Sequence, residues 1–251
     1  MEPVNPTVLR DVFERQFEVK LFMDESGNGN PSQPLIVGAV ELGDDAEDVE
    51  EGIQDLYKRL VARHSLTGFG SFEEFRKDGF HSANDPTEIS APFREFMRNT
   101  FYRAFVVVSD RTRFPGKVES ELIEFMYVRL LGDLLIRHRH ESEFLCYIEQ
   151  SQEMSSIIRR LPDAVARRAR QKAGRDVPLP QLNISMVTKR QFMSTAIIDY
   201  VMADVSRWLQ KDRTINPKDF AYRAFREIEP SISMLYSFEL GRISSRKDPL
   251  H

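Results

Sequence analysis

The sequence predicts an α/β fold in which a mixed β-sheet of about five strands opens with an antiparallel hairpin and is flanked by helices. Two observations lead to this class. The first is a pair of apolar runs joined by a segment rich in Gly, Asn and Pro, at residues 27–34, which is typical of a β-hairpin. The second is the later alternation of short apolar runs with long amphipathic segments, which indicates strands joined by helical crossovers.

Each element follows from the local pattern of apolar and turn residues. Strand-like patterns occur at residues 18–23, 35–40, 103–109, 144–148 and 182–187. Helical spacing of apolar residues occurs at residues 46–63, 89–99, 118–137 and 192–209, and a further helix is expected somewhere in 153–173. Residues 64–85 contain two glycines and are expected to be a long irregular segment. After Pro217 no pattern is assigned.

The length of 251 residues is enough for one domain with a large core. We expect an N-terminal extension at 1–17 with a short helix at 7–15, one α/β domain at 18–215, and a C-terminal extension at 216–251 packed on that domain. The single cysteine, Cys146, excludes a disulfide within the chain and a zinc site built on cysteines. No apolar run approaches the roughly 20 residues that span a bilayer, and the N-terminus lacks a signal-peptide pattern, which favours a cytoplasmic protein.

Charge is distributed unevenly along the chain. The net charge of -4 argues against a general affinity for nucleic acid, so such binding needs a local basic patch. Residues 41–55 contain eight acids and no base, and residues 159–175 contain seven bases and one acid. A solvated helix face is the simpler explanation of each run. The alternative for the basic run is a surface that contacts backbone phosphates through Arg167, Arg168, Arg170 and Lys172.

Three acids stand where a metal-dependent active site needs them. Asp24 directly follows the first strand and Glu149 directly follows the fourth. Asp199 lies within the last long helix, and its neighbours three and four residues away are uncharged, so it needs a cation or hydrogen-bond donors from elsewhere. Asp204 differs, because Arg207 three residues on predicts an ordinary surface ion pair. For Asp24, an Asp that only caps its own turn is the simpler alternative.

The segment Phe22-Met-Asp-Glu-Ser-Gly27, followed by a turn and an apolar strand, resembles the opening of the bacterial and phage family known as domain of unknown function 3800 (DUF3800). The segments Gly79-Phe-His-Ser82 and Ile198-Asp-Tyr-Val201 resemble two further parts of that family, and the resemblance covers residues 18 to about 210. It implies a ribonuclease H-like fold, a metal-dependent nuclease activity and a site role for His81. Two positions differ, because Ala196 stands where the family commonly has Gln and Glu149 where it has Asp.

The residues and the resemblance together predict hydrolysis of nucleic-acid phosphodiesters with one or two Mg²⁺ or Mn²⁺ ions. Asp24, Glu149 and Asp199 would hold the ions, which lower the pKa of the attacking water and neutralise the leaving oxygen. Glu25 would support the ions, although a side chain directed to solvent is the simpler alternative. His81 would assist proton transfer.

Lys189 and Arg190 lie between the fifth strand and the last helix, where they would meet a substrate phosphate. Two solvated loop cations are the simpler alternative. Other functions remain open: a non-catalytic ribonuclease H-like module that binds nucleic acid or a protein partner, or a hydrolase of nucleotides and other small phosphate esters. The sequence does not distinguish DNA from RNA, or a monomer from a homo-oligomer.

Overall fold

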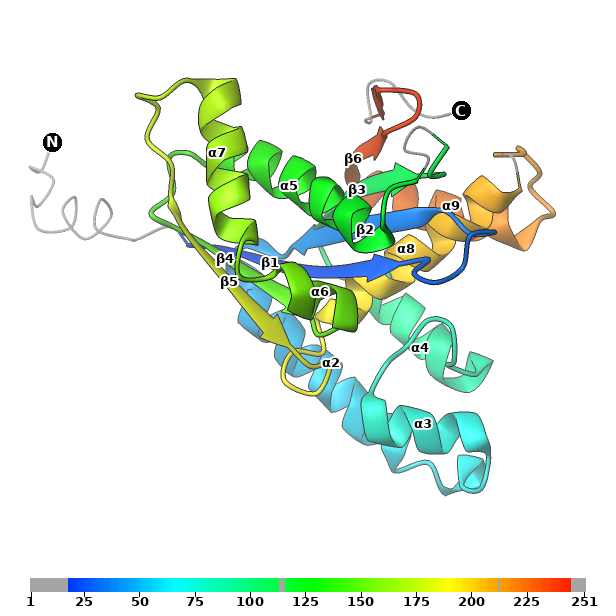
Figure 1. Cartoon of the computed structure of the whole chain (residues 1–251). Coiled ribbons are helices and arrows are strands. Elements are labelled where there is room, and N and C mark those ends of the chain that lie inside the picture. The colour runs from blue at the N-terminus through cyan, green and yellow to red at the C-terminus, as the bar shows by residue number, and fades with distance from the viewer. Residues whose placement is uncertain (1–17, 113–115, 212, 245–251) are drawn as a thin grey trace, which may run out of the picture.

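The computed structural model describes residues 18–112, 116–211 and 213–244. Its centre is a seven-stranded sheet with the order β5-β4-β1-β2-β3-β6-β7 (Figure 1). β2 is antiparallel to β1 and β3, whereas β4 and β5 run parallel to β1 and β6 runs parallel to β3. The strands are β1 Glu18–Ser26, β2 Leu35–Glu41, β3 Arg103–Ser109, β4 Glu143–Glu149, β5 Gln181–Val187, β6 Ile232–Ser237 and β7 Arg242–Ser244.

Five neighbouring strands, β3-β2-β1-β4-β5 with β2 alone antiparallel, have the arrangement of a ribonuclease H-like sheet. The predicted fold class is therefore confirmed. The sheet has two more strands than expected, because β6 and β7 extend it beyond β3. Within the segment 216–251, expected to form an extension, residues 232–237 and 242–244 thus contribute to the sheet itself. The helix predicted at residues 7–15 lies outside the described residues.

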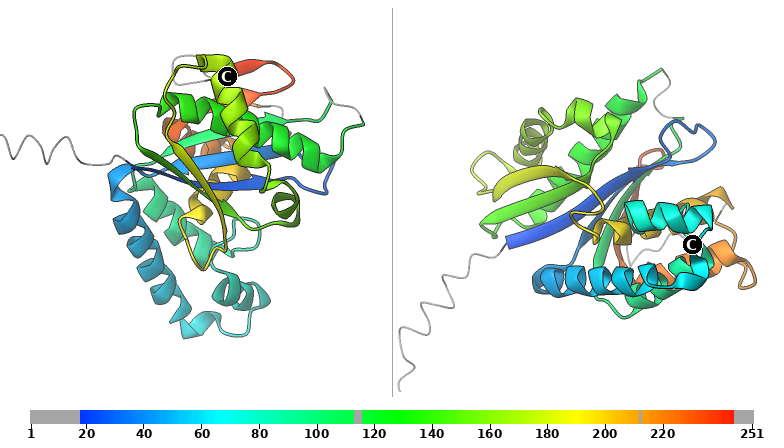
Figure 2. Two further views of the ribbon diagram at one scale, coloured as in Figure 1. Left: turned by 60° about the vertical axis from the view of Figure 1, so that its left-hand side comes forward. Right: turned by 90° about the horizontal axis from the view of Figure 1, so that it is seen from below.

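Helices cover both faces of the sheet (Figure 1, Figure 2). The core on one face contains side chains of α2, α3, α4, α8 and α9, and the core on the other contains side chains of α5, α6 and α7. The helices are α2 Ala46–Val61, α3 Gly70–Asp78, α4 Thr87–Arg98, α5 Glu119–Arg137, α6 Gln152–Ile157, α7 Leu161–Ala173, α8 Thr195–Gln210 and α9 Phe220–Ile228. Within the described part of the chain, none of them is both long and apolar enough to cross a membrane.

The segment 64–85, expected to be irregular, contains the helix α3. This helix buries Phe72 and Phe75, which stand three residues apart as on one side of a helix. Their rings pack together with Phe80, which follows the helix. Gly68 precedes the helix and Gly70 is its first residue, so neither glycine interrupts its turns. The prediction was wrong about this part of the segment because it took the two glycines as breakers.

Alternation along β1 determines which side chains reach which face of the sheet. Phe22 belongs to the core on the α8 face, whereas Leu21 and Met23 belong to the core on the α5 face. Because successive side chains of a strand point to opposite faces, Asp24 points to the α8 face and Glu25 to the α5 face. The two adjacent acids are therefore directed to different surroundings.

α8 packs very closely against β2 at Gly38. A Cβ atom added to Gly38 would lie 2.5 Å from Ile198 Cδ1 and 3.0 Å from Met202 Cγ. A side chain at this position would therefore require Ile198 or Met202 to shift. The absence of a side chain at Gly38 allows these two residues of α8 to pack directly against β2.

Candidate functional site

Asp24 and Glu149 lie side by side, Asp24 within β1, two residues before its end, and Glu149 at the end of β4. The two strands are parallel and Met23 pairs with Ile148, so the residues that follow are neighbours at the same edge. Two residues earlier on each strand, an aromatic side chain packs into the core on the α8 face, so both carboxylates point to that face. The parallel topology thus brings together two acids that are far apart in the sequence.

Asp199 completes this group from α8. Ile198, the residue before it, packs against Gly38, and Gly38 is the register partner of Asp24 on β2. Asp199 is 8% exposed, and its charge acts on both Asp24 and Glu149. The three acids predicted from the sequence therefore meet at one edge of the sheet, and we call them the acid cluster.

The ammonium group of Lys189 lies within the acid cluster. Its Nζ atom is 2.9 Å from Asp199 Oδ2 and 3.4 Å from Glu149 Oε2. Lys189 comes from the loop between β5 and α8 and is only 7% exposed. This buried position differs from the solvated loop cation that was the simpler alternative from the sequence. Asp199 therefore has a cationic partner, although none on its own helix.

Carboxylates outnumber cations in the acid cluster, and the pKa values reflect this. Burial raises the pKa of Asp24 well above its ordinary value, and the charge of Glu149 raises it further. Burial likewise raises the pKa of Glu149, against the opposing effect of Lys189. Burial also works against the charge of Asp199, but Lys189 and His81 bring its pKa below the ordinary value. The uncompensated negative charge is thus concentrated on Asp24 and Glu149.

The loop that precedes α4 is bound to α8 beside the acid cluster. Ser82 donates to Asp199 twice, from its backbone N to Oδ2 at 3.0 Å and from its hydroxyl to Oδ1 at 2.7 Å. His81 Nδ1 lies 3.8 Å from Asp199 Oδ2. Burial lowers the pKa of His81 below its ordinary value, although Asp199 acts against this. The imidazole is therefore mainly neutral near pH 7 and can accept a proton.

Asp85 holds the same loop in place and was not predicted. Its Oδ2 accepts hydrogen bonds from the hydroxyl of Tyr200 at 2.6 Å and from the backbone N of His81 at 2.8 Å. Burial raises the pKa of Asp85 to about 6. The only sequence signal is Asp85-Pro86, which indicates a turn but not a contact with α8.

Glu25 is held apart from the acid cluster on the other face of the sheet. Its Oε2 accepts a hydrogen bond from the hydroxyl of Tyr127 on α5 at 2.7 Å, and Asn28 contacts its Oε1 at 3.5 Å. Burial raises the pKa of Glu25. Its charge also acts on Asp24, but its carboxylate is engaged with α5. The structure does not bring Glu25 together with the three other predicted metal ligands.

Asp204 also departs from its predicted role, which was an ordinary surface ion pair with Arg207. The carboxylate is fully buried. Arg207 does donate to its Oδ1 at 2.8 Å, and so does Arg94 of α4, at the same distance. The prediction was wrong because Arg94 lies far away in the sequence and joins Asp204 only through the packing of α4 on α8.

The hairpin loop after Asp24 is fixed by a residue that sequence reasoning missed. Arg111 follows β3 with a φ of 68°, and its Nη2 donates to the carbonyl of Gly27 at 2.6 Å. The same nitrogen pairs with Glu119 of α5 at 3.2 Å, and Glu119 accepts from the backbone N of Gly29 at 2.7 Å. These contacts of Arg111 and Glu119 hold the hairpin loop that follows Asp24 in place.

A cavity of about 570 Å³ opens beside the acid cluster. Glu149, Lys189, His81 and Arg190 line it, together with the beginning of α6. The guanidinium group of Arg190 lies over the ring of Tyr57, 4.9 Å from its centre. Charged groups of both signs therefore line an open cavity next to the acids.

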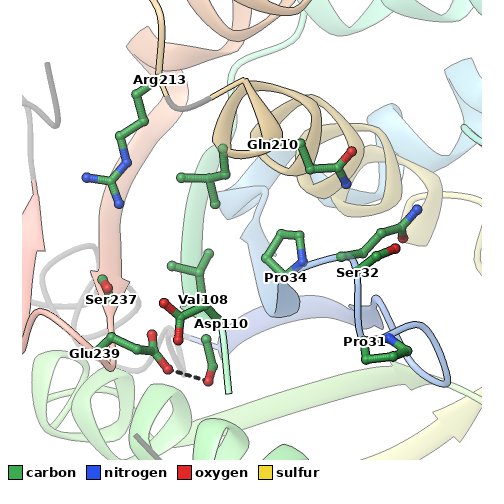
Figure 3. A pocket seen from close by; sticks show the side chains of 12 residues that line it. Pro31, Ser32, Pro34, Val108, Asp110, Gln210, Arg213, Ser237 and Glu239 are labelled. Atoms are coloured by element: carbon green, nitrogen blue, oxygen red, sulfur yellow. Dashed lines mark hydrogen bonds between the residues drawn. The ribbon is translucent and has the colours of Figure 1, made fainter. Parts of the chain in front are cut away.

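A second cavity of about 530 Å³ lies at the same edge of the sheet, beyond β2 (Figure 3). The ends of β3, β6 and α8 line it together with the hairpin loop. One of its acids, Glu239, accepts a hydrogen bond from Ser109 at 2.6 Å. None of the predicted site residues lines this cavity, so the acid cluster and its own cavity remain the candidate site.

The four basic residues predicted to contact nucleic acid from the run at 159–175 lie on α7. Arg168 and Lys172 are paired with Asp133 of α5, at 3.6 Å and 3.0 Å. Arg167 and Arg170 are exposed. The run is therefore not one uniform surface.

Among the described residues, no group of three or more His, Cys, Asp or Glu side chains is arranged to hold a metal ion. Within the acid cluster, Lys189 contacts both Glu149 and Asp199, and Asp199 is also bound to Ser82. The donor chemistry nevertheless fits a hard divalent cation, since carboxylate oxygens are its preferred ligands. One of these oxygens, Glu149 Oε2, is buried, and its contact with Lys189 at 3.4 Å is an ion pair without hydrogen-bond geometry.

Comparison with known proteins finds likeness in fold alone. No family model matches the chain, and no curated protein is similar to it in sequence. The RNase HII in a PCNA:RNase HII complex from Archaeoglobus fulgidus is 16% identical with a TM-score of 0.43, over 85% of this chain and 89% of that one. A point variant of Bst-RNase HIII is 12% identical with a TM-score of 0.38, over 85% of this chain and 68% of that one.

Proposed function

We propose that this chain hydrolyses phosphodiester bonds of nucleic acid with a divalent cation, Mg²⁺ or Mn²⁺, bound by Asp24, Glu149 and Asp199. One observation carries the proposal. Acids from three separate elements have a single ammonium group among them, which contacts Glu149 and Asp199, and the pKa values of Asp24 and Glu149 are raised. Uncompensated buried charge is costly, and such perturbed groups concentrate at functional sites. The resemblance to DUF3800 agrees with this activity and remains part of the proposal.

A divalent cation suits these residues by charge and by donor type. It would take the position that Lys189 Nζ has here, because Glu149 Oε2 and Asp199 Oδ2 both face that position. An ion bound there would supply a water molecule of lowered pKa and neutralise charge on the phosphate. The proposal therefore requires that Lys189 leave the acid cluster when the ion binds.

The chain's own residues have definite tasks in this reaction. Ser82 keeps the Asp199 carboxylate oriented through two hydrogen bonds. His81 lines the cavity with a lowered pKa and accepts the proton of the attacking water. Lys189 lines the same cavity, and once released from the acids its ammonium group contacts a phosphate oxygen of the substrate.

Thermal unfolding with and without cation tests the proposal. The melting temperature of the wild type should rise with Mn²⁺ or Mg²⁺, and Asp24→Asn should abolish this rise. Asp163→Asn, which removes an exposed acid of α7, is the matched control and should keep it. In parallel, cleavage of DNA and RNA oligonucleotides should require cation and fall by at least about 100-fold in Asp24→Asn and Asp199→Asn.

Three results would contradict the proposal or redirect it. A wild-type chain without a cation-dependent rise in melting temperature has no metal site of this kind. Cleavage that persists in EDTA or in Asp24→Asn would remove the acid cluster from the reaction. Hydrolysis of nucleotides without hydrolysis of oligonucleotides would assign the site to small phosphate esters.

A second candidate function, a non-catalytic module that binds nucleic acid or a protein partner, is favoured by Lys189 itself. Acids neutralised by the chain's own ammonium group need no ion. Lys189→Met separates the two functions by isothermal titration with Mn²⁺. If the acids form a cation site, removal of the competing ammonium group should tighten Mn²⁺ binding. If they form a structural cluster, Lys189→Met should lose stability without any gain in Mn²⁺ binding.

A further inference from the structure

The basic run at residues 159–175 separates into two sets with different surroundings. The first set faces α5 and is neutralised there: Arg160 binds Glu124 at 2.7 Å, and Lys172 binds Asp133 at 3.0 Å. The second set is exposed and makes no ion pair within the described residues; it consists of Arg167, Arg170 and Arg175. Arg159, which precedes α7, is exposed as well. Ion pairs with α5 thus explain three of the seven bases, Arg160, Arg168 and Lys172, and do not explain the second set.

These three arginines line one cavity of about 600 Å³, which we call the arginine pocket. Arg167 and Arg170 lie about one turn apart on α7. Gly174, with a φ of 104°, ends the helix and turns the chain so that Arg175 lines the same cavity. The only acid in the lining is Asp176. Three guanidinium groups against one carboxylate give the pocket a positive charge in a protein whose net charge is -4.

We propose that the arginine pocket binds phosphate groups of a nucleic-acid backbone. The planar fork of a guanidinium group matches phosphate oxygens, and several arginines around one cavity favour a ligand with repeated negative charge. No aromatic residue lines the pocket, so it provides no face on which a base can stack. The contact is therefore to the backbone and independent of base sequence.

The arginine pocket and the acid cluster lie at opposite ends of β5, and the inference that one substrate reaches both rests on the proposed function. α7 lies beside β5 (Figure 1, Figure 2). The pocket residues precede β5, whereas Lys189 follows it. A strand of this length spans roughly 23 Å, and successive nucleotides of a duplex rise about 3.4 Å, so roughly seven base pairs connect the two places. The substrate is then an extended nucleic acid rather than a mononucleotide.

Fluorescence anisotropy with labelled oligonucleotides of about 20 nucleotides, in EDTA so that no cleavage occurs, tests the proposal. The variant R167Q/R170Q/R175Q should bind at least about tenfold more weakly than the wild type. The slope of log K against the logarithm of the salt concentration should become shallower by about two to three, because three positive charges are removed. The control variant R59Q/R63Q/K218Q removes three exposed cations elsewhere and should change the affinity by less than about twofold. Wild-type affinity should fall for duplexes shorter than roughly seven base pairs.

Several outcomes would overturn the inference: no binding by the wild type, equal affinities of the two variants, or affinity that does not depend on duplex length. A wild type stabilised by inorganic pyrophosphate through these arginines, but unable to bind oligonucleotides, would make the pocket a site for a free anion. Failure of the proposed function has a different signature, because cleavage and the cation-dependent rise in melting temperature would be missing while oligonucleotide binding through the arginines persisted.

Discussion

Helix α8 carries two buried aspartates whose charges are balanced in opposite ways. Asp204 is fully buried and accepts hydrogen bonds from two guanidinium groups, those of Arg94 and Arg207. Asp199 is also buried, but Lys189, its closest cation, is shared with another carboxylate at 3.4 Å and also acts on a third. One region therefore has an excess of positive charge, and the other an excess of negative charge.

This difference separates a structural ion cluster from a candidate site. A buried carboxylate with enough cations holds its elements together, here α4 and α8, and breaking such a cluster is costly. A group of buried carboxylates with too few cations lowers the stability of the folded state. A positively charged ligand that binds there restores that stability. Burial of an acid alone does not identify a site, whereas the local balance of charge does.

The largest effect on stability should come from the balanced region. Asp204→Asn leaves two guanidinium groups without their carboxylate, so we expect the free energy of unfolding to fall by about 3 kcal/mol. Urea unfolding at neutral pH measures this. Asp199→Asn, which leaves Lys189 beside Glu149, should lose clearly less. Equal losses in the two variants would show that the regions do not differ in the way described.

A smaller effect of opposite sign should come from Asp24→Asn, which we expect to stabilise the chain in EDTA by about 1 kcal/mol. Burial and Glu149 raise the pKa of Asp24, so the folded state binds the proton more tightly than the unfolded state. The stability of the wild type therefore falls as pH rises through the raised pKa, and the variant lacks this decline. Melting temperatures measured from about pH 4, near the ordinary pKa of Asp, upward test this. Parallel profiles of the two proteins would contradict it.

The smallest effect on stability should come from Asp85. This residue connects the two regions through Tyr200, which donates a hydrogen bond to Asp85 and has Arg94 over its ring, 5.3 Å from the ring centre. The pKa of Asp85 is raised from 3.8 to about 6 in the fold. The stability that the wild type gains from this proton is complete below about pH 4 and is lost as pH rises to about 6. The difference in melting temperature between wild type and Asp85→Asn should decline over that interval. A constant difference would remove Asp85 from the pH dependence.

Most of the sheet and all three members of the acid cluster follow from local sequence patterns. Strands are short apolar runs, and an acid directly after such a run lies at the carboxyl end of its strand, so parallel pairing alone brings Asp24 to Glu149. The C-terminal part was missed, although Asp219 caps α9 by accepting from Ala221 N, and Phe225 and Ile228 show helical spacing.

The cationic partners were not predictable, because they depend on tertiary packing. Lys189 reaches Asp199 only through the path of the loop between β5 and α8, and Arg94 reaches Asp204 only through the contact of two helices. The position of Glu25 is a different case. Strand alternation already places it on the opposite face from Asp24, so its separation from the acid cluster was accessible from the sequence.

The acid cluster depends on an uncharged residue, Gly38, through the packing of α8 on β2. The missing side chain of Gly38 allows Ile198 to pack directly against β2 at the register partner of Asp24. A single methyl group gained there, by Gly38→Ala, would lie 2.5 Å from Ile198 Cδ1, so this neighbour of Asp199 or its surroundings would have to shift without a change to any charged residue. A related protein with Ala at this position would keep every acid of the cluster but not the packing beside Asp199. A comparison of the acidic residues alone would therefore not show the difference.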